Sequence, residues 1–205
     1  MVKVKICGVT DTACVDALNA ARPDYVGFVL NGGFRRSIDY AAAKRIRAAL
    51  SPDILTVGVF VNERMERIAE FIDGGIIQLV QLHGDEDEEY IAALKQMRSV
   101  PIIKAVGVRE GVLPKLPAGC DYILLDAYAP VSRGGTGIRC EWKRYPSDVP
   151  IILAGGITPE NVGQAISLVA PYAVDCSGGV ETDGKKDKNK IASYVANARE
   201  ADIYG

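Results

Sequence analysis

Short apolar runs alternate with stretches of helical periodicity along the whole chain. Most of the runs are nearly continuous in apolar residues, which is typical of parallel strands covered on both faces. They predict eight strands, over Val2–Ile6, Tyr25–Leu30, Ile54–Val61, Ile76–Leu82, Pro101–Val106, Tyr122–Asp126, Val149–Ala154 and Tyr172–Cys176.

Helical periodicity fills the intervals between these strands. It predicts helices over Thr12–Ala21, Ala41–Leu50, Arg64–Asp73, Glu86–Met97, Pro159–Val169 and Asp187–Arg199, with short segments near Val112 and at Glu141–Tyr145. Two start signals support the pattern. Asp11 is a favourable cap for the first helix, and Thr158 precedes a proline at a first helical position. The acidic run over residues 85–89 opens the fourth helix, where negative charge suits the helix dipole.

Eight strand–helix units follow one another without a polar linker or a break in composition. This is the pattern of a closed (β/α)8 TIM barrel, an α/β fold. A chain of 205 residues suits one domain, so we expect a single barrel domain over residues 1–205. The competing architecture is an open doubly wound sheet, which favours a glycine-rich fingerprint after its first strand. Gly8 stands alone there, so that fingerprint is missing.

Charge and cysteine content narrow the class of protein. A net charge of −2 argues against a nucleic-acid or membrane-surface binder. No apolar run reaches membrane-spanning length, and no N-terminal signal segment is evident. The five cysteines form an odd set with no spacing suited to structural zinc. We therefore expect reduced thiols, a cytoplasmic location and no metal site.

Residues capable of chemistry gather just after the strands. In a β/α barrel the active site is built from the loops at the carboxyl ends of the strands. Cys7 follows the first strand, Arg36 lies in the loop after the second, His83 follows the fourth and Asp126 ends the sixth. The barrel therefore predicts that these four side chains share one pocket.

The last two strands lead into glycine-rich turns. Gly155 and Gly156 follow the seventh strand, and Ser177 and Gly178 follow the eighth. Glycines let backbone N–H groups approach an anion closely, and these two loops frequently form the phosphate site of a β/α barrel. We therefore expect a phosphate site here, in preference to simple tight turns.

Each single residue also has a plain structural explanation. Cys7 is either a reactive thiolate or a small buried filler, the usual role of free cysteine. Arg36 suits a two-pronged contact to a carboxylate or phosphate, or is solvated as we expect for Arg35. His83 faces a ligand or precedes the acidic helix as a cap, and one histidine without a second ligand cluster does not indicate a metal. Asp126, at the mouth of an apolar strand, suits an acid role or a turn.

A further glycine-rich loop, residues 132–137, follows the sixth strand. It suits a mobile lid, a third phosphate contact or a plain surface loop, and the sequence does not choose among these.

Taken together, these motifs resemble the phosphoribosylanthranilate isomerase family of tryptophan biosynthesis over essentially the whole chain. The resemblance rests on Lys5-Ile-Cys7-Gly8-Val-Thr10, Gly27-Phe28-Val29, Val57-Gly-Val-Phe60-Val61-Asn62, Val80-Gln81-Leu-His83-Gly84, Leu125-Asp126, Gly134-Gly-Thr-Gly137, Leu153-Ala-Gly-Gly156-Ile-Thr-Pro-Glu-Asn161-Val162 and Asp175-Cys-Ser-Gly-Gly-Val-Glu181. The chain departs from the family pattern at Phe34 and Gly178, where the family more often has serine.

The resemblance implies an Amadori rearrangement of N-(5-phosphoribosyl)anthranilate, with Cys7 as general base and Asp126 as general acid. It also implies that Arg36 holds the anthranilate carboxylate and that the two glycine-rich turns, with His83, complete the substrate site. No cofactor is implied. The expected partner is the small phosphoribosyl substrate, and we expect a monomer or a weak homodimer.

Two other functions compete with this one. The related isomerase of histidine biosynthesis uses a pair of aspartates, with an aspartate where this chain has Cys7, so Cys7 counts against it. A catalytically silent phosphate-binding barrel is the second, and the presence of both Cys7 and Asp126 argues against it.

Overall fold

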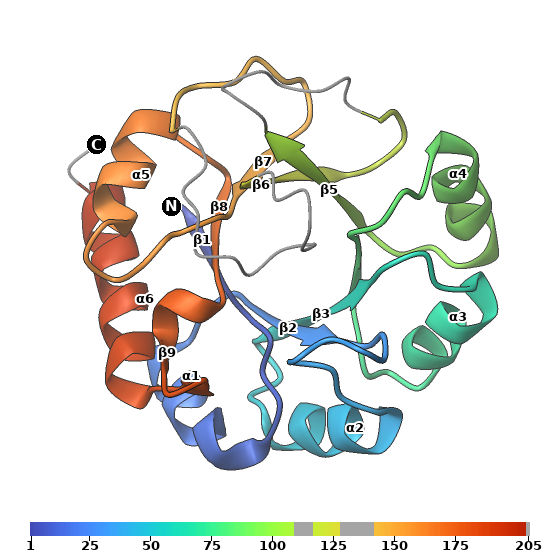
Figure 1. Ribbon diagram of the computed structural model, residues 1–205, viewed down its shortest axis with the longest axis horizontal. Coiled ribbons are helices and arrows are strands. Elements are labelled where there is room, and N and C mark those ends of the chain that lie inside the picture. Colours follow the sequence, from blue (N-terminus) through green and yellow to red (C-terminus); the bar gives the residue numbers. More distant parts are fainter. Residues whose placement is uncertain (109–116, 128–141, 204–205) are drawn as a thin grey trace.

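Eight parallel strands close into a barrel in this computed structural model, which describes residues 1–108, 117–127 and 142–203. The strands follow one another around the barrel in chain order, and β8 pairs with β1 to close it (Figure 1). Their bounds are β1 Lys3–Cys7, β2 Tyr25–Val29, β3 Leu55–Phe60, β4 Leu79–Leu82, β5 Ile102–Val108, β6 Tyr122–Ala127, β7 Ile151–Leu153 and β8 Ala173–Cys176. The prediction of a TIM barrel with eight strands is confirmed.

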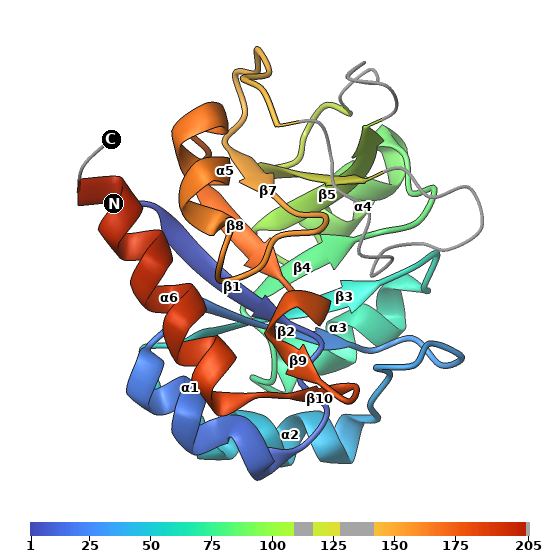
Figure 2. The same ribbon diagram turned by 60° about the vertical axis from the view of Figure 1, so that its left-hand side comes forward.

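Helices cover the outside of the barrel, as Figures 1 and 2 show. They are α1 Val15–Ala21, α2 Tyr40–Ala49, α3 Met65–Asp73, α4 Glu88–Met97, α5 Val162–Val169 and α6 Lys188–Ile203. A short 3₁₀ helix, Thr12–Cys14, precedes α1, and the Asp11 side chain caps it by accepting from the amide of Ala13 at 2.8 Å.

Strand alternation sorts the side chains into two layers. On β1, Val4 and Ile6 point outward into the main core between strands and helices. Lys5 and Cys7 lie at the alternate positions, which point into the barrel. On β3, Val57 belongs to a smaller cluster that fills the barrel interior. A parallel strand buried on both faces thus delivers every second residue toward the barrel axis.

Two helix predictions need correction. Of the segment predicted as helix at Glu141–Tyr145, the described residues 142–145 are irregular. Pro146 follows, and the residue before a proline is disfavoured in the helical region. Thr158 does not cap α5, which begins at Val162. The side chain of Asn161 accepts from the Thr158 amide at 2.8 Å and holds a turn there instead. The segment predicted near Val112 lies outside the described residues.

A small hairpin that the sequence pattern did not predict follows β8. Strands β9 Glu181–Thr182 and β10 Lys185–Lys186 pair antiparallel after β8. A 3₁₀ turn, Gly178–Val180, links β8 to the hairpin. Figure 2 shows the hairpin near the carboxyl end of β1. It therefore lies at the end of the barrel where the predicted site residues converge.

Candidate active site

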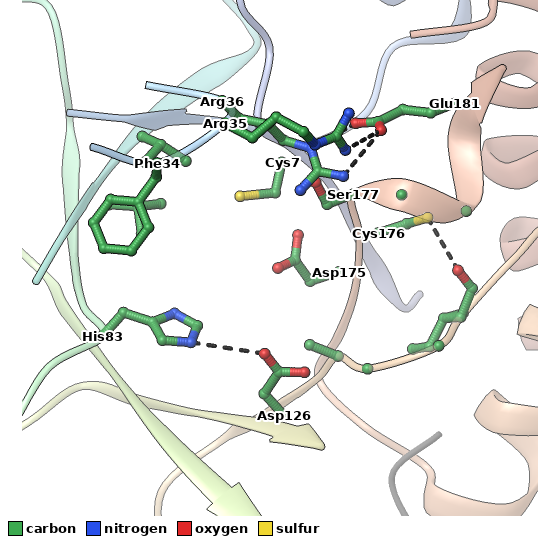
Figure 3. Close-up of a pocket in the computed structure, with 18 of the residues that line it drawn as sticks. Cys7, Phe34, Arg35, Arg36, His83, Asp126, Asp175, Cys176, Ser177 and Glu181 are labelled. Atoms are coloured by element: carbon green, nitrogen blue, oxygen red, sulfur yellow. Dashed lines mark hydrogen bonds and ion pairs between the residues drawn. The ribbon is translucent and has the colours of Figure 1, made fainter. Parts of the chain in front are cut away.

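A cavity of about 780 Å³ opens at the carboxyl ends of the strands. All eight residues singled out from the sequence line it, namely Cys7, Arg36, His83, Asp126, Gly155, Gly156, Ser177 and Gly178. Figure 3 shows the labelled side chains around this space. The loop of residues 132–137 lies outside the described residues.

Cys7 ends β1 with its thiol in the cavity wall and is 8% exposed. Gly27 lies opposite it on β2, in register. A Cβ atom at Gly27 would stand 2.7 Å from Sγ of Cys7, so only glycine leaves room for the thiol. Burial raises the pKa of Cys7, while the ammonium of Lys5 acts to lower it. The thiol therefore depends on a nearby cation to ionise.

That cation belongs to a buried ion pair directly beneath the thiol. Lys5 and Asp175 face each other in register across β1 and β8, with Nζ of Lys5 3.1 Å from Oδ2 of Asp175. Burial alone would lower the pKa of Lys5, but Asp175 and Cys7 outweigh it and raise that pKa. Lys5 is therefore held as an ammonium two residues below Cys7 on the same face of the strand.

Asp175 itself borders the cavity and was not singled out from the sequence. Burial raises the pKa of its carboxyl, and Lys5 opposes this. Its Oδ1 atom is buried and has no hydrogen-bond partner among the described residues. In Figure 3 the carboxylate points into the space between Cys7 and Asp126. A lysine within the buried strand Lys3–Cys7 was the available signal for such a pair, because a buried ammonium requires a partner.

Asp126, at the end of β6, faces His83 across the cavity. Oδ2 of Asp126 lies 3.6 Å from Nε2 of His83. On the other side of the ring, Nε2 of Gln81 and Nδ1 of His83 are 2.9 Å apart. With the amide nitrogen as donor, a neutral imidazole carries its proton on the nitrogen that faces Asp126. Gln81 thus fixes the orientation of the ring, and the sequence analysis gave it no role.

The loop that carries His83 is held by a buried ion pair. Nζ of Lys104 on β5 lies 2.9 Å from Oε2 of Glu86 and donates to the Gly84 carbonyl at 2.7 Å. Glu86 also accepts from the Gly84 amide at 2.9 Å. The expectation that the whole acidic run serves the helix dipole was therefore wrong for Glu86. Helix α4 begins only at Glu88, and Asp87 caps it.

The two glycine-rich turns lie side by side and are linked by a side-chain hydrogen bond. Gly155 and Gly156 have φ values of +85° and +66°, a region that favours glycine. Sγ of Cys176 donates to the carbonyl of Ile157 at 3.1 Å, joining the turn after β8 to the turn after β7. A Cβ atom at Gly179 would stand 2.1 Å from that same carbonyl oxygen. The backbone of the two turns is therefore closely packed around one side of the cavity.

Three cations gather on Glu181 next to these turns. Arg36 binds it through two contacts, Nε to Oε1 at 2.6 Å and one terminal nitrogen to Oε2 at 2.9 Å. Arg35 contributes a bond of 2.7 Å and Lys186 one of 2.8 Å. Burial would by itself raise the pKa of Glu181, but the hydrogen bonds from Arg36, Lys186 and Arg35 lower it to about 2. The cluster keeps an excess of positive charge at the cavity edge.

Arg36 reaches the turn after β8 as well as Glu181. Its terminal nitrogen would be 3.5 Å from a Cβ atom at Gly178. Lys186 donates to the Ser177 carbonyl at 2.9 Å. Sequence reasoning missed Glu181 and Lys186 as site residues, because neither directly follows a barrel strand. The hairpin β9–β10 brings both back over the mouth of the barrel.

Neither metal-ligand clusters nor spanning helices are evident in the described part of the chain. Among residues 1–108, 117–127 and 142–203, no group of three or more His, Cys, Asp or Glu side chains is placed to hold a metal ion. No helix there combines the length and the hydrophobicity needed to cross a membrane.

A family model and named relatives match nearly the whole chain. The model of the N-(5′-phosphoribosyl)anthranilate (PRA) isomerase family matches residues 4–197. The N-(5′-phosphoribosyl)anthranilate isomerase of Lachnoclostridium phytofermentans is 43% identical over 210 residues, which cover 94% of this chain and 95% of that protein.

Solved structures agree with the sequence match. The dimeric phosphoribosylanthranilate isomerase of Thermotoga maritima, solved as monomers generated from it, gives a TM-score of 0.79 at 34% identity, covering 98% of this chain and 100% of that chain. A phosphoribosylanthranilate isomerase in complex with reduced 1-(o-carboxyphenylamino)-1-deoxyribulose 5-phosphate gives a TM-score of 0.77 at 34% identity with the same coverage.

Proposed function

Because the chain belongs to the PRA isomerase family, isomerases of tryptophan biosynthesis, we propose that it performs the Amadori rearrangement with Cys7 as general base and Asp126 as general acid. The substrate is N-(5-phosphoribosyl)anthranilate and the product is 1-(2-carboxyphenylamino)-1-deoxyribulose 5-phosphate. The observation that carries the proposal is the presence of Cys7 and Asp126 in one cavity beside the two glycine-rich turns.

The two groups suit the two proton transfers of the reaction. Asp126 gives a proton to the ring oxygen of the sugar, the ring opens and an iminium forms between the sugar and the anthranilate nitrogen. Cys7 then removes the proton from C2, and the resulting enolamine tautomerises to the ketone. The iminium accepts the electron pair, so these steps require no cofactor. Each positioned acid or base typically contributes about 10²–10⁴-fold in rate.

Cys7 must be a thiolate to act as the base, and Lys5 is the group we propose for that purpose. Free cysteine has a pKa of about 8.5, and burial raises the pKa further. The ammonium of Lys5 is fully buried, so solvent does not screen its charge. Asp175 keeps Lys5 charged and leaves one oxygen facing the cavity.

The anionic ends of the substrate match the rest of the cavity. We propose that Gly155, Gly156, Ser177 and Gly178 hold the phosphate through backbone and hydroxyl groups, as glycine-rich turns do elsewhere. Arg36 has five N–H donors, and Glu181 takes two of them. The donors that remain suit the anthranilate carboxylate. His83, oriented by Gln81, completes the binding site beside Asp126.

We propose that residues 1–205 act as one barrel domain, as a monomer or a weak homodimer, on a small-molecule substrate and without nucleic-acid or membrane partners. The four cysteines that the structure describes are free thiols, which supports a reducing, cytoplasmic location.

The proposal is tested by following the loss of anthranilate fluorescence when the protein meets N-(5-phosphoribosyl)anthranilate. Cys7→Ser and Asp126→Asn should each lower kcat by about 10²-fold or more. Cys14→Ser, which changes a buried cysteine outside the cavity, is the matched control and should keep near-wild-type turnover. Absence of turnover by the wild type, or full turnover by either site variant, would contradict the proposed mechanism.

A further inference from the structure

Phe34 is a large apolar side chain left uncovered at the cavity. It is 39% exposed, whereas nearly all the large apolar side chains of the described residues are packed into the core. It also lines the cavity, and Figure 3 shows its ring on the side of the open space that His83 borders. An exposed aromatic ring at a cavity favours contact with a ligand, because its apolar surface is removed from water only when a ligand covers it.

The loop that carries Phe34 is fixed by hydrogen bonds before and after this residue. The Phe34 amide donates to Oγ of Ser37 at 3.1 Å, and the Ser37 amide donates to the Phe34 carbonyl at 3.0 Å. At the start of the loop, Asn31 exchanges two bonds with the backbone of Val61, at 2.7 and 3.0 Å. The ring is therefore presented from an ordered turn, which reduces the entropy lost when a ligand packs on it.

Apolar side chains line the cavity where β2 and β3 end, close to the loop that carries Phe34. Val29 at the end of β2, Val59 in β3 and Val61 just after β3 are among the lining residues. Val29 pairs with Ser37, the residue that is hydrogen-bonded to Phe34. The turns after β7 and β8 and the cations on Glu181 occupy another side. The cavity thus has an apolar part near Phe34 and a part near Gly178 that is bordered by glycine-rich turns and cations, with Cys7 and Asp126 between them.

We propose that Phe34 packs against the aromatic ring of the substrate and is a specificity-determining residue for aryl-bearing sugar phosphates. The inference rests on the proposed function and adds a residue to it. A substrate whose phosphate lies at Gly155 and Gly178 and whose reacting carbons lie between Cys7 and Asp126 places its ring toward the apolar wall. The carboxylate of that ring is ortho to the nitrogen that joins the ring to the sugar, so it points back toward Arg36 on the side of the cations while Phe34 covers the face of the ring.

The proposal predicts an effect on binding that depends on the ring. Phe34→Ala should raise KM for N-(5-phosphoribosyl)anthranilate by about 5- to 20-fold. This is the effect expected when one contact between aromatic rings is lost together with the apolar area that it buries. The effect on kcat should be small, because Phe34 does not transfer a proton. Phe34→Leu keeps an apolar side chain and should give an intermediate KM.

A ring-free competitor separates ring contact from damage to the loop. Ribulose 5-phosphate carries the phosphate and sugar but no aryl group, so its inhibition constant should stay within about twofold in Phe34→Ala, since a surface truncation away from a ligand has little effect. Leu168→Ala, at an exposed leucine of α5 that does not line the cavity, is the control for loss of an exposed apolar side chain and should leave KM unchanged.

The outcomes distinguish this inference from the function on which it rests. Turnover by the wild type with an unchanged KM in Phe34→Ala would overturn the role of Phe34 and leave the proposed function intact. An equal loss of affinity for ribulose 5-phosphate would also overturn it, because the defect would then lie in the loop. No turnover by the wild type would refute the proposed function itself.

Discussion

At the scale of single residues, the chemistry of Cys7 depends on charges supplied from other positions. The thiol is buried, which disfavours its anion, and Lys5 is the strongest opposing influence. Asp175 raises the pKa of the thiol in turn, while it keeps Lys5 protonated. Lys5 therefore counteracts part of the rise in the pKa of Cys7 that burial and Asp175 cause.

The first prediction concerns Lys5→Met, which removes the ammonium and keeps a long side chain. Activity that needs the thiolate rises with pH through the pKa of Cys7, and loss of Lys5 raises that pKa. The rising limb of kcat/KM should therefore move to higher pH, and activity at neutral pH should fall about tenfold for each unit of displacement. The rate of alkylation of Cys7 by iodoacetamide, followed against pH, should shift in parallel.

A second variant guards against simple loss of folding. Lys5→Met leaves Asp175 without its counter-ion, so Lys5→Met combined with Asp175→Asn removes both charges and should restore stability. Both variants should be shown to be folded by circular dichroism. If the rising limb of their kcat/KM profiles lies at the same pH as in the wild type, Lys5 does not lower the pKa of Cys7.

At the scale of elements, the site is built where loops leave the strands, and its backbone is closely packed. The turns after β7 and β8 touch through Cys176 and Ile157. Gly179 lies against the same carbonyl, so the approach of the two turns requires the absence of a side chain there. Each turn thus depends on the other for its shape.

The second prediction compares two glycines that differ in the space around them. Gly179→Ala should lower stability by about 1–3 kcal/mol through overpacking, and it should raise KM because the proposed phosphate turns move apart. Gly163→Ala lies within α5, where the new Cβ would stand an ordinary 3.5 Å from Cβ of Ala201. It should stabilise the protein by up to about 1 kcal/mol and leave KM unchanged. Thermal denaturation and steady-state kinetics measure both effects, and equal behaviour of the two variants would contradict the packing argument.

At the scale of the whole molecule, the mouth of the barrel is held by contacts between distant parts of the chain. Glu181 of β9 joins Arg35 and Arg36 from the loop after β2 to Lys186 of β10. This cluster lies near the seam where β8 pairs with β1. Barrel closure and assembly of the site are therefore linked, because both need the C-terminal hairpin in place.

The third prediction follows from the low pKa of Glu181. Its pKa is about 2 in the folded protein, against a usual 4.5. A carboxyl whose pKa is lower in the folded than in the unfolded protein stabilises the fold at pH values above its unfolded-state pKa. That contribution is lost as the pH falls toward its folded-state pKa. The shift corresponds to about 3 kcal/mol, to be lost between pH 4.5 and about 2. Urea unfolding of the wild type should show this loss, and Glu181→Gln should show a correspondingly weaker dependence on pH. If the free energy of unfolding depends on pH in the same way in both proteins, Glu181 does not have the low pKa.

The sequence by itself determined the eight barrel strands, the closed barrel and the end of the barrel at which the candidate site lies. These features follow from periodicity and from the position of residues such as Cys7 and Asp126 just after apolar runs, and both are local properties of the chain. The same locality explains the errors. Glu86 looked like a helix-dipole residue because its partner, Lys104, comes from the next strand.

Only the tertiary structure decided which charges meet. Lys5 pairs with Asp175 because β8 returns to β1, and Arg36 binds Glu181 because the hairpin folds back over the mouth of the barrel. Phe34 likewise acquired a candidate role only when its ring was found at the apolar side of the cavity. Closure of the barrel brings the two ends of the chain together and so determines these electrostatic and packing partners. Because the partners are far apart in the sequence, no local pattern predicts them.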